Sequence, residues 1–158
     1  MNGQRRWTLW MLVDSAFPSG GFAHSGGLEA AVQAGLYRGQ DGVSEYARES
    51  LRQAASFSVP FLRRAYRGDL CAADAEFQAC VAGNGVARSA SLSQGKEFLL
   101  AACEAFGEES PEIGSILASL RARIGRGEIA GHWVVIVGFV GAQLDLTLED
   151  VEQLFMFL

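Results

Sequence analysis

Ser25 lies in a segment whose spacing could serve nucleophilic catalysis. The segment reads Ala-His-Ser-Gly-Gly, and a small-x-Ser-x-Gly pattern is typical of a nucleophile elbow, in which a strained turn exposes the serine hydroxyl. His132 could then act as the base, and the acid that orients it could be Asp41, Asp69 or Asp74. The elbow requires strands before and around the serine, whereas most of this chain has helical periodicity. A serine esterase of the α/β-hydrolase type with Ser25 as its nucleophile is therefore an alternative function.

The histidines and cysteines do not form a metal-binding pattern. His24 and His132 are far apart in the chain, and neither belongs to an HxxxH or HExxH motif. We expect His132, which precedes an apolar run, to be a buried histidine with satisfied hydrogen bonds, and His24 to lie exposed in a glycine-rich loop. Cys71, Cys80 and Cys103 lack CxxC spacing, so we expect them to be small apolar residues in helix interiors.

The pair Gly95-Lys96 resembles the end of a phosphate-binding loop, but the rest of that motif is missing. Position 90 is Ala where the loop needs its first glycine, and position 97 is Glu where it needs Ser or Thr. The sequence therefore predicts no nucleotide cradle, and we expect no cofactor in this chain.

The charge balance argues against nucleic acid as a partner. The 158 residues carry a formal net charge of −5 and a single lysine, Lys96, whereas nucleic-acid binding relies on basic side chains that neutralise phosphates. The apolar stretch after Arg6 ends at Asp14, too early for a signal peptide. The longest apolar run, Trp133–Val140, is far shorter than the roughly 20 residues that span a bilayer. We therefore expect a cytoplasmic protein that does not bind membranes.

The elements that must position these residues are predicted to be helices. The clearest apolar stripe recurs at helical spacing and consists of Val43, Tyr46, Ala47, Leu51, Ala54, Phe57, Phe61, Leu62 and Ala65. Pro60 should break or kink this helix, because proline lacks an amide hydrogen and clashes with the preceding turn. Helical patterns also cover residues 70–81 and 86–106, where Leu92, Leu99 and Phe106 are expected core residues.

Local signals at other segments are less uniform. Ser110 is suited to cap a helix that starts at Pro111, and Ser25 could cap one that ends near Gly35. Residues 7–13 could form a short buried helix or a strand. Residues 133–137 are rich in β-branched side chains and resemble a strand locally, but no partner strand is evident. We therefore expect a buried helix over residues 128–144 and an all-α chain.

The C-terminal residues form an unusually apolar helix. Val151, Leu154, Phe155 and Leu158 share one face, while Met156 and Phe157 point elsewhere. A helix that is apolar on several sides needs cover on several sides. We expect this end either to dock on another subunit or to be covered by helices that this chain lacks.

Three sequence blocks resemble signatures of the UreF family of urease accessory proteins. Residues 14–29, Asp-Ser-Ala-Phe-Pro-Ser-Gly-Gly-Phe-Ala-His-Ser-Gly-Gly-Leu-Glu, are similar to the N-terminal signature, in the form of the plant-like, eukaryotic branch. Residues 88–99 resemble the S-x-x-Q-G-[RK] helix, and residues 132–138 resemble the H-x-P-V-V-x-G block, with Val134 in place of proline. The blocks occur in family order, whereas the R-L-x-P-L-G-Q block of the C-terminal helices is absent.

This resemblance implies an all-α, single-domain helical bundle over residues 1–158 that lacks the family's C-terminal helices. It also implies a homodimeric, non-enzymatic adapter for nickel insertion into urease. The implied partners are a UreD/UreH-type scaffold, a UreG-type GTPase whose activity the adapter regulates, and apo-urease. Nickel and GTP would be handled by the complex and the partner GTPase. A generic helical dimerisation module unrelated to urease is a further alternative.

The resemblance and the exposed-loop reading together suggest a set of partner-binding residues. Glycines allow the backbone of such a loop to adopt positive φ, and exposed aromatic residues are frequent anchors of interfaces. Phe17 and Phe22 could equally anchor the loop to the protein's own core. The candidate residues are Phe17, Pro18, Gly20, Gly21, Phe22, His24, Ser25, Gly26, Leu28, Glu29, Gln94, Gly95 and Lys96.

Overall fold

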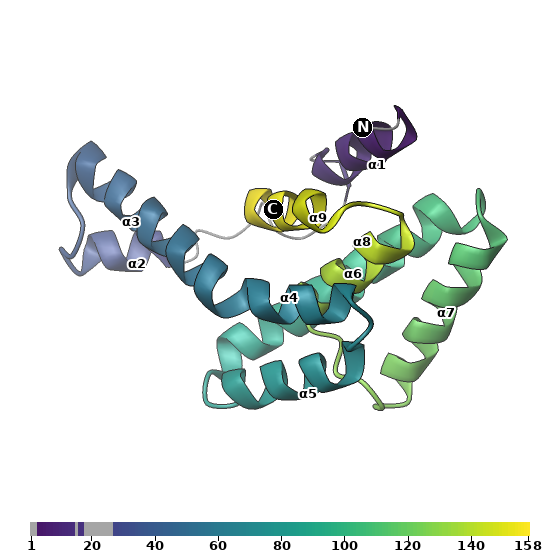
Figure 1. The fold of residues 1–158 in the computed structure, drawn as a ribbon. Coiled ribbons are helices and arrows are strands. Elements are labelled where there is room, and N and C mark those ends of the chain that lie inside the picture. The colour runs from purple at the N-terminus through teal and green to yellow at the C-terminus, as the bar shows by residue number, and fades with distance from the viewer. Residues whose placement is uncertain (1–2, 15, 18–26) are drawn as a thin grey trace.

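Helices account for every regular element among residues 3–14, 16–17 and 27–158, the part of the chain that the computed structural model describes (Figure 1). This confirms the predicted all-α fold. In chain order the elements are α1 (Gly3–Val13), α2 (Leu28–Gln33), α3 (Gly39–Gln53), the π-helical turn η2 (Ala54–Ser58), α4 (Val59–Tyr66), α5 (Leu70–Val81), α6 (Gly85–Gly107), α7 (Pro111–Gly125), α8 (Trp133–Gln143) and α9 (Leu148–Phe157).

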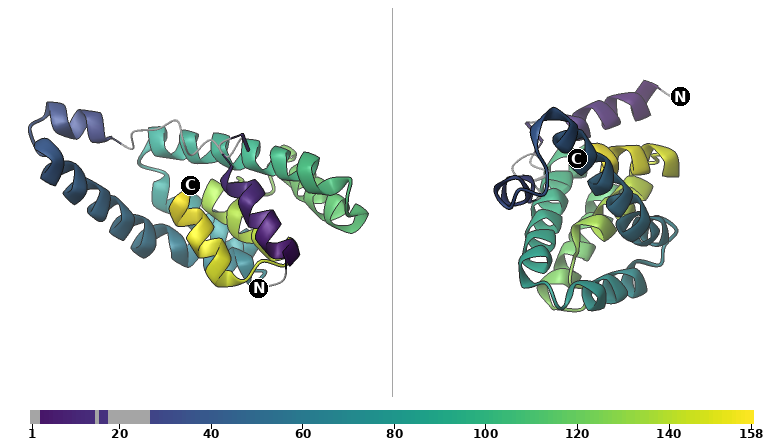
Figure 2. Two further views of the ribbon diagram at one scale, coloured as in Figure 1. Left: turned by 90° about the horizontal axis from the view of Figure 1, so that it is seen from above. Right: turned by 90° about the vertical axis from the view of Figure 1, so that its left-hand side faces the viewer.

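Helix α8 forms the centre of the core. Helices α4, α6 and α9 pack around it, and α5 also contacts it (Figures 1 and 2). Its consecutive β-branched residues, 134–137, are all buried, because neighbouring helices cover several of its sides. A Cβ atom at Gly138 would collide with the backbone of Leu62 on α4, so glycine permits close packing of these two helices. The prediction of a buried helix in place of a strand is confirmed for residues 133–143, whereas residues 128–132, which were expected in the same helix, lie before it.

Helices α3 and α4 form a nearly continuous rod with Pro60 inside it. Pro60 is the second residue of α4, and the wider turn η2 lies immediately before that helix. Because proline has no amide hydrogen and crowds the preceding turn, the chain accommodates it with a π-type turn, a known response to local insertions and strain. At the position where a break or kink was predicted, the structure therefore has a change from α-helix to π-helix and back along the rod.

The predicted apolar stripe divides into a buried and an exposed part along this rod. Leu62 and Ala65 on α4 belong to the core, but Val43 and Leu51 on α3 are largely exposed. Figures 1 and 2 show why, because α2 and α3 project beyond the body that α4 to α9 form. Periodicity predicts which residues form a stripe, and the structure shows that only the α4 part of this stripe is covered by other helices of the chain.

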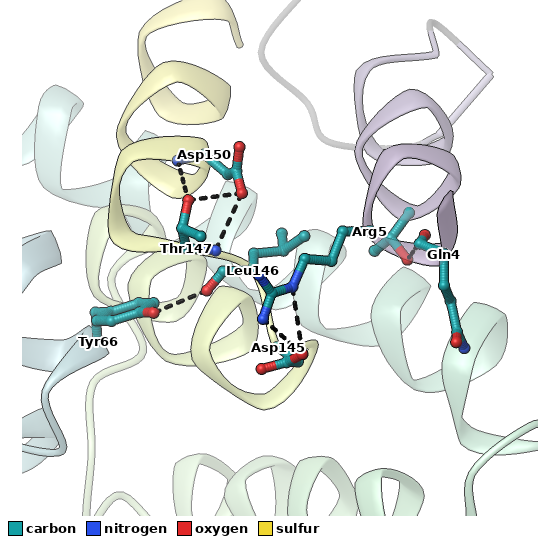
Figure 3. Close-up of polar contacts among 8 residues, drawn as sticks. Gln4, Arg5, Tyr66, Asp145, Leu146, Thr147 and Asp150 are labelled. Atoms are coloured by element: carbon teal, nitrogen blue, oxygen red, sulfur yellow. Dashed lines mark hydrogen bonds and ion pairs between the residues drawn. The ribbon is translucent and has the colours of Figure 1, made fainter. Parts of the chain in front are cut away.

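Helix α1 is held against the turn between α8 and α9. Arg5 donates a hydrogen bond from Nη2 to Asp145 Oδ2 at 2.8 Å, and Tyr66 on α4 donates its hydroxyl to the carbonyl of Leu146 at 2.7 Å (Figure 3). Asp145 has a φ of 55°, an uncommon left-handed conformation for a residue with a side chain. Leu12 is buried, but Trp7 is 72% exposed, so the predicted burial of residues 7–13 applies to one face only.

Side-chain caps fix several helix ends. Ser110 accepts from the amide of Ile113 and caps α7, as predicted, and Asn84 caps α6 by accepting from Ala87. Helix α9 begins with a reciprocal pair in which Thr147 and Asp150 bond each other's backbone amides (Figure 3). The N-cap of α2 is Gly27, which has a φ of 99°, so the predicted cap by Ser25 was wrong.

The described helices include none that is both long and apolar enough to cross a bilayer. The C-terminal helix buries Val151, Leu154 and Phe155, whereas Phe157 is 60% exposed. This distribution matches the predicted face, and it leaves part of the last turn in contact with solvent.

Candidate protein-interaction surface

Most of the predicted N-terminal contact residues lie outside the described part of the chain. Pro18, Gly20, Gly21, Phe22, His24, Ser25 and Gly26 belong to this group. Their proposed contacts therefore stay predictions.

Phe17 is described, and it lies in the core. Its ring packs edge to face on that of Phe98, with centroids 5.7 Å apart. Of the two roles considered for Phe17, the structure favours anchoring the chain to α6. On α2, by contrast, Leu28 is half-buried and Glu29 is exposed, so Glu29 is accessible to a partner.

The three residues of the second block have different environments on α6. Gln94 is half-buried and Lys96 is exposed, while Gly95 is buried. A Cβ atom at Gly95 would overlap the carbonyl oxygen of Gly131. Gly95 therefore permits two backbone segments to approach closely, and any surface contact from this block must come from its two neighbours.

Gln94 lines a groove of about 280 Å³ between α3, α6, α8 and α9. We call it the Trp133 groove. Leu51, at its edge, is 49% exposed. The lining is mostly apolar and consists of Ser50, Leu51, Ala54, Gln94, Trp133, Phe155, Met156 and Leu158.

The indole nitrogen of Trp133 has no hydrogen-bond partner among the described residues. Nε1 is buried, and the ring itself packs on Phe155 with centroids 5.0 Å apart. A buried donor without an acceptor costs about 1–3 kcal/mol relative to a satisfied one, and native proteins rarely leave such a group unpaired. The Trp133 groove is thus lined mostly by apolar side chains, and one of its lining residues carries a buried donor without an acceptor among the described residues.

The arm formed by α2 and α3 extends the apolar surface beyond this groove. Leu36 and Val43 are exposed there together with Leu51. On the same arm the rings of Tyr37 and Tyr46 pack edge to face at 5.3 Å between centroids. Large exposed apolar surface is typical of protein–protein contacts. The groove and the arm together form the candidate interaction surface.

His132 is buried, as predicted, and both of its ring nitrogens are bonded. Nε2 lies 2.6 Å from Gln78 Oε1, and Nδ1 lies 3.1 Å from Ser91 Oγ. Burial lowers the pKa of His132 below its ordinary value near 6.5, an effect that Asp74 opposes and Arg88 reinforces. To act as the base of a serine hydrolase, this ring would have to leave both partners.

The candidate acids of that hydrolase are also engaged elsewhere or distant from His132. The carboxylate of Asp74 accepts hydrogen bonds from the backbone amides of residues 130–132. Asp69 forms an ion pair with Arg64, and Asp41 lies exposed on the projecting arm. Together with the lack of any strand among the described residues, this geometry weighs against the esterase alternative.

Among the described residues, no group of three or more His, Cys, Asp and Glu side chains is placed to hold a metal ion. The cysteines differ from prediction, because Cys71 and Cys80 are exposed and Cys103 is half-buried. Burial raises the pKa of the Cys103 thiol. Their helical placement was correct, but interior packing of the first two was wrong.

Trp133 was not among the predicted site residues. In the sequence Trp133 is the first residue of an apolar run, and this pattern predicts only that it belongs to a buried helix. Its indole, unlike the aliphatic side chains that follow, carries a polar donor that needs a partner when buried. That property is the signal by which the sequence could have singled it out.

Comparison with known proteins agrees with the three sequence blocks. The UreF family model matches residues 37–158. The chain is 30% identical to urease accessory protein F of Oryza sativa subsp. indica over 161 residues, which cover 99% of this chain and 60% of that protein. It is also 30% identical to urease accessory protein F of Arabidopsis thaliana, with 96% and 63% covered, and to urease accessory protein UreF of Paenarthrobacter aurescens, with 99% and 68% covered.

The chain thus spans about three fifths of the length of the plant relatives that it matches. No solved structure matches it closely. The family match covers most of the chain, and relatives from plants and bacteria share the same description. This chain belongs to the UreF family of urease accessory proteins.

Proposed function

We propose that this protein is an adapter in urease maturation that acts by binding other proteins. Its partners are a UreD/UreH-type scaffold, a UreG-type GTPase that the adapter regulates, and apo-urease. In this proposal the protein acts in the cytoplasm, catalyses no reaction itself and forms homodimers. Nickel is cargo of the assembled complex, and GTP is bound by the partner GTPase.

The observation that carries the proposal is the unpaired Trp133 donor in an apolar groove of a UreF-family chain. Trp133 Nε1 is buried without an acceptor in the part of the chain that the structure describes, and Gln94, a residue of the family-like second block, lines the same groove. Aromatic residues in desolvated pockets are frequent energetic centres of interfaces. A partner segment with an apolar side chain and an accessible oxygen would match both properties.

The exposed arm supports the same proposal. Leu36, Val43 and Leu51 would each gain from removal of their exposed apolar surface from water, at about 25 cal/mol per Å². The arm and the groove are continuous at Leu51, which belongs to α3 and lines the groove. We therefore place the principal partner contact across α3, α6 and the end of α9.

The test compares two exposed apolar residues changed in the same way. Leu51→Asp introduces a charge at the edge of the groove, whereas Val86→Asp introduces one at the start of α6, where Val86 is 83% exposed. Binding of each variant to the purified scaffold protein and to the scaffold–GTPase complex is measured by titration calorimetry. Leu51→Asp should weaken binding at least about tenfold, equivalent to about 1.4 kcal/mol, while Val86→Asp should bind like the unchanged protein.

If both variants bind as tightly as the unchanged protein, the partner contact does not include this part of α3. Failure of the unchanged protein to bind either partner would contradict the adapter role itself. If the unchanged protein instead dimerises through α3 and binds no urease maturation protein, the generic dimerisation module is the better description. Thermal unfolding of each variant establishes that the substitutions leave the fold intact.

A further inference from the structure

A buried polar cluster joins three segments of the chain beneath the Trp133 groove. It consists of Asp74 and Gln78 on α5, Ser91 on α6, and His132 in the segment that leads into α8. His132 is 0% exposed. Since these segments are distant in sequence, the cluster fixes how α5, α6 and the start of α8 fit together.

The hydrogen-bond distances fit a neutral imidazole whose proton lies on Nε2. Gln78 Oε1 can only accept, so His132 Nε2 carries the proton and donates it at 2.6 Å. Nδ1 then accepts from the Ser91 hydroxyl, while Ser91 Oγ accepts from the backbone amide of Trp133 at 3.3 Å. The neutral ring with its proton on Nε2 thus satisfies both of its nitrogens without any change at Ser91.

Asp74 completes the attachment of the same segment. Its carboxylate accepts from the amides of Ala130 at 2.6 Å, Gly131 at 3.1 Å and His132 at 2.9 Å. Four consecutive backbone amides, 130–133, are thus bonded to side chains of α5 and α6. These amides form the approach to Trp133, whose indole lines the groove.

Two charged groups act on the His132 ring, from the two helices packed against it. Asp74 on α5 favours the protonated ring, and Arg88 on α6 disfavours it. Helix α8 contributes no charge, because residues 133–143 include no acidic or basic side chain. In the preceding loop, Glu128 is paired with Arg123 and Arg126 at the surface.

Protonation would break the pattern at one identifiable point. An imidazolium carries protons on both nitrogens, so Nδ1 would need an acceptor where the Ser91 hydroxyl now donates. Ser91 would have to turn its proton away, and the ring would carry an uncompensated charge without solvent contact. Opening of the segment exposes the ring to water, which removes both penalties.

We propose that His132 is an acid-sensitive latch, whose protonation releases residues 130–133 from α5 and α6 and thereby loosens the Trp133 groove. The latch operates in the isolated chain and does not require any partner. Its loss in acid would couple the shape of the groove to pH. Histidine suits this role because its ordinary pKa lies within the physiological range.

The test follows the individual amides of residues 130–133 by hydrogen exchange in the 158-residue chain. Protection factors, corrected for intrinsic exchange rates, are measured from about pH 7 to about pH 5.5. These protection factors should fall roughly tenfold. If His132 is protonated only in the open state, with its ordinary pKa near 6.5, the population of the open state rises by about a factor of ten for each pH unit below that value. Amides in the middle of α7 should show no comparable change.

Two variants separate His132 from other acid effects. His132→Gln keeps a donor for Gln78 but cannot titrate, so the acid dependence of the four amides should disappear. Gln78→Glu places a carboxylate on the Nε2 proton, which stabilises the imidazolium in the closed state and should also abolish the fall. Gln78→Glu further serves as the test if His132→Gln does not fold.

Protection that falls equally in the unchanged protein and in Gln78→Glu would overturn the proposal. Protection that does not change with pH in the unchanged protein would also overturn it. Neither result would bear on partner binding, so the latch and the adapter role fail independently.

Discussion

Gly95 and Gly131 meet backbone to backbone where α6 crosses the segment before α8. A Cβ atom at Gly95 would lie 3.0 Å from the amide nitrogen of Trp133 and would overlap the carbonyl of Gly131. Neither obstacle is a flexible side chain that could rotate away. The glycine of the family-like second block is therefore required by packing, and this contact brings Gln94 and Trp133 to the same groove.

Gly95→Ala should destabilise the protein by about 3 kcal/mol or more, at the upper end of the overpacking range, because backbone atoms have to move. Gly85→Ala is the matched control on the same helix, since no atom lies within 4 Å of the added methyl group. It should change stability by no more than about 0.5 kcal/mol. Urea unfolding curves provide the measurement, and equal effects of the two substitutions would contradict the close approach.

Leu99→Ala tests the orientation of α6. Leu99 is buried in the core, so its truncation should cost about 2–5 kcal/mol through lost burial and the cavity that remains. Leu36→Ala, on the exposed arm, should cost less than about 1 kcal/mol. The melting temperatures of both variants are compared with that of the unchanged protein. A Leu99→Ala variant that melted normally would show that α6 faces the core differently.

Phe155 and Phe157 should respond in opposite ways to the same substitution. Phe155 is 6% exposed and packs on Trp133, whereas Phe157 is 60% exposed. Phe155→Ser should therefore lower stability by about 3–5 kcal/mol, while Phe157→Ser should leave the melting temperature nearly unchanged and raise solubility. Melting curves and light scattering check the two effects. Solubility gained by Phe155→Ser without loss of stability would contradict the packing of α9.

The stability of the protein should decrease in mild acid through His132. Because burial lowers its pKa below 6.5, the unfolded chain binds this proton more readily than the folded one. The stabilisation is present above about pH 6.5 and is lost as pH falls towards the folded-state pKa, by up to about 1.4 kcal/mol per pH unit. Urea unfolding at about pH 7 and about pH 5.5 measures this loss.

His132→Gln should remove this contribution to the pH dependence and leave only that of the carboxylates. Glu152 acts in the same direction at lower pH, because its hydrogen bond with Arg63 lowers its pKa. Stability from that pair is present above the ordinary carboxyl pKa and is lost as pH falls below it. Curves of the variant and the unchanged protein that remained parallel down to about pH 5.5 would contradict the role of His132.

The parts of the fold that sequence could predict depend on local chemistry. The cap at Ser110 was predictable because its hydroxyl can accept from a backbone amide at the start of a helix. The helical state of residues 133–143 was predictable because the sequence offers no partner for a strand there. Exposure of Leu51 did not follow, because periodicity states which residues share a face but not which element covers it. Cys71 and Cys80 were misplaced for the same reason.

The candidate site was less predictable because it depends on contacts between distant segments. Gly95 and Lys96 were both predicted as partner-binding residues, yet the glycine is buried against Gly131 and only the lysine is exposed. The role of Trp133 requires knowledge that no acceptor within the described ranges reaches its indole nitrogen. Such a fact appears only once α3, α6, α8 and α9 are placed together.

The indole proton of Trp133 provides a direct test of the groove. The chain has three tryptophans, so a nitrogen–proton correlation spectrum should contain three indole signals, and the signal missing from Trp133→Phe identifies the one of interest. No residue that the structure describes accepts a hydrogen bond from this donor. When the scaffold partner binds, a new hydrogen bond to Nε1 should move the signal downfield and slow its exchange with solvent. The signals of Trp7 and Trp10, which lie on α1 outside the groove, serve as internal references.

Trp133→Phe keeps most of the apolar contact but removes the donor, so it should weaken partner binding by up to about tenfold, the equivalent of one hydrogen bond worth about 0.5–1.5 kcal/mol. Its stability should change little, because the lost donor was unsatisfied. A complex that forms with full affinity while the Trp133 signal stays in place would show that the partner occupies another surface.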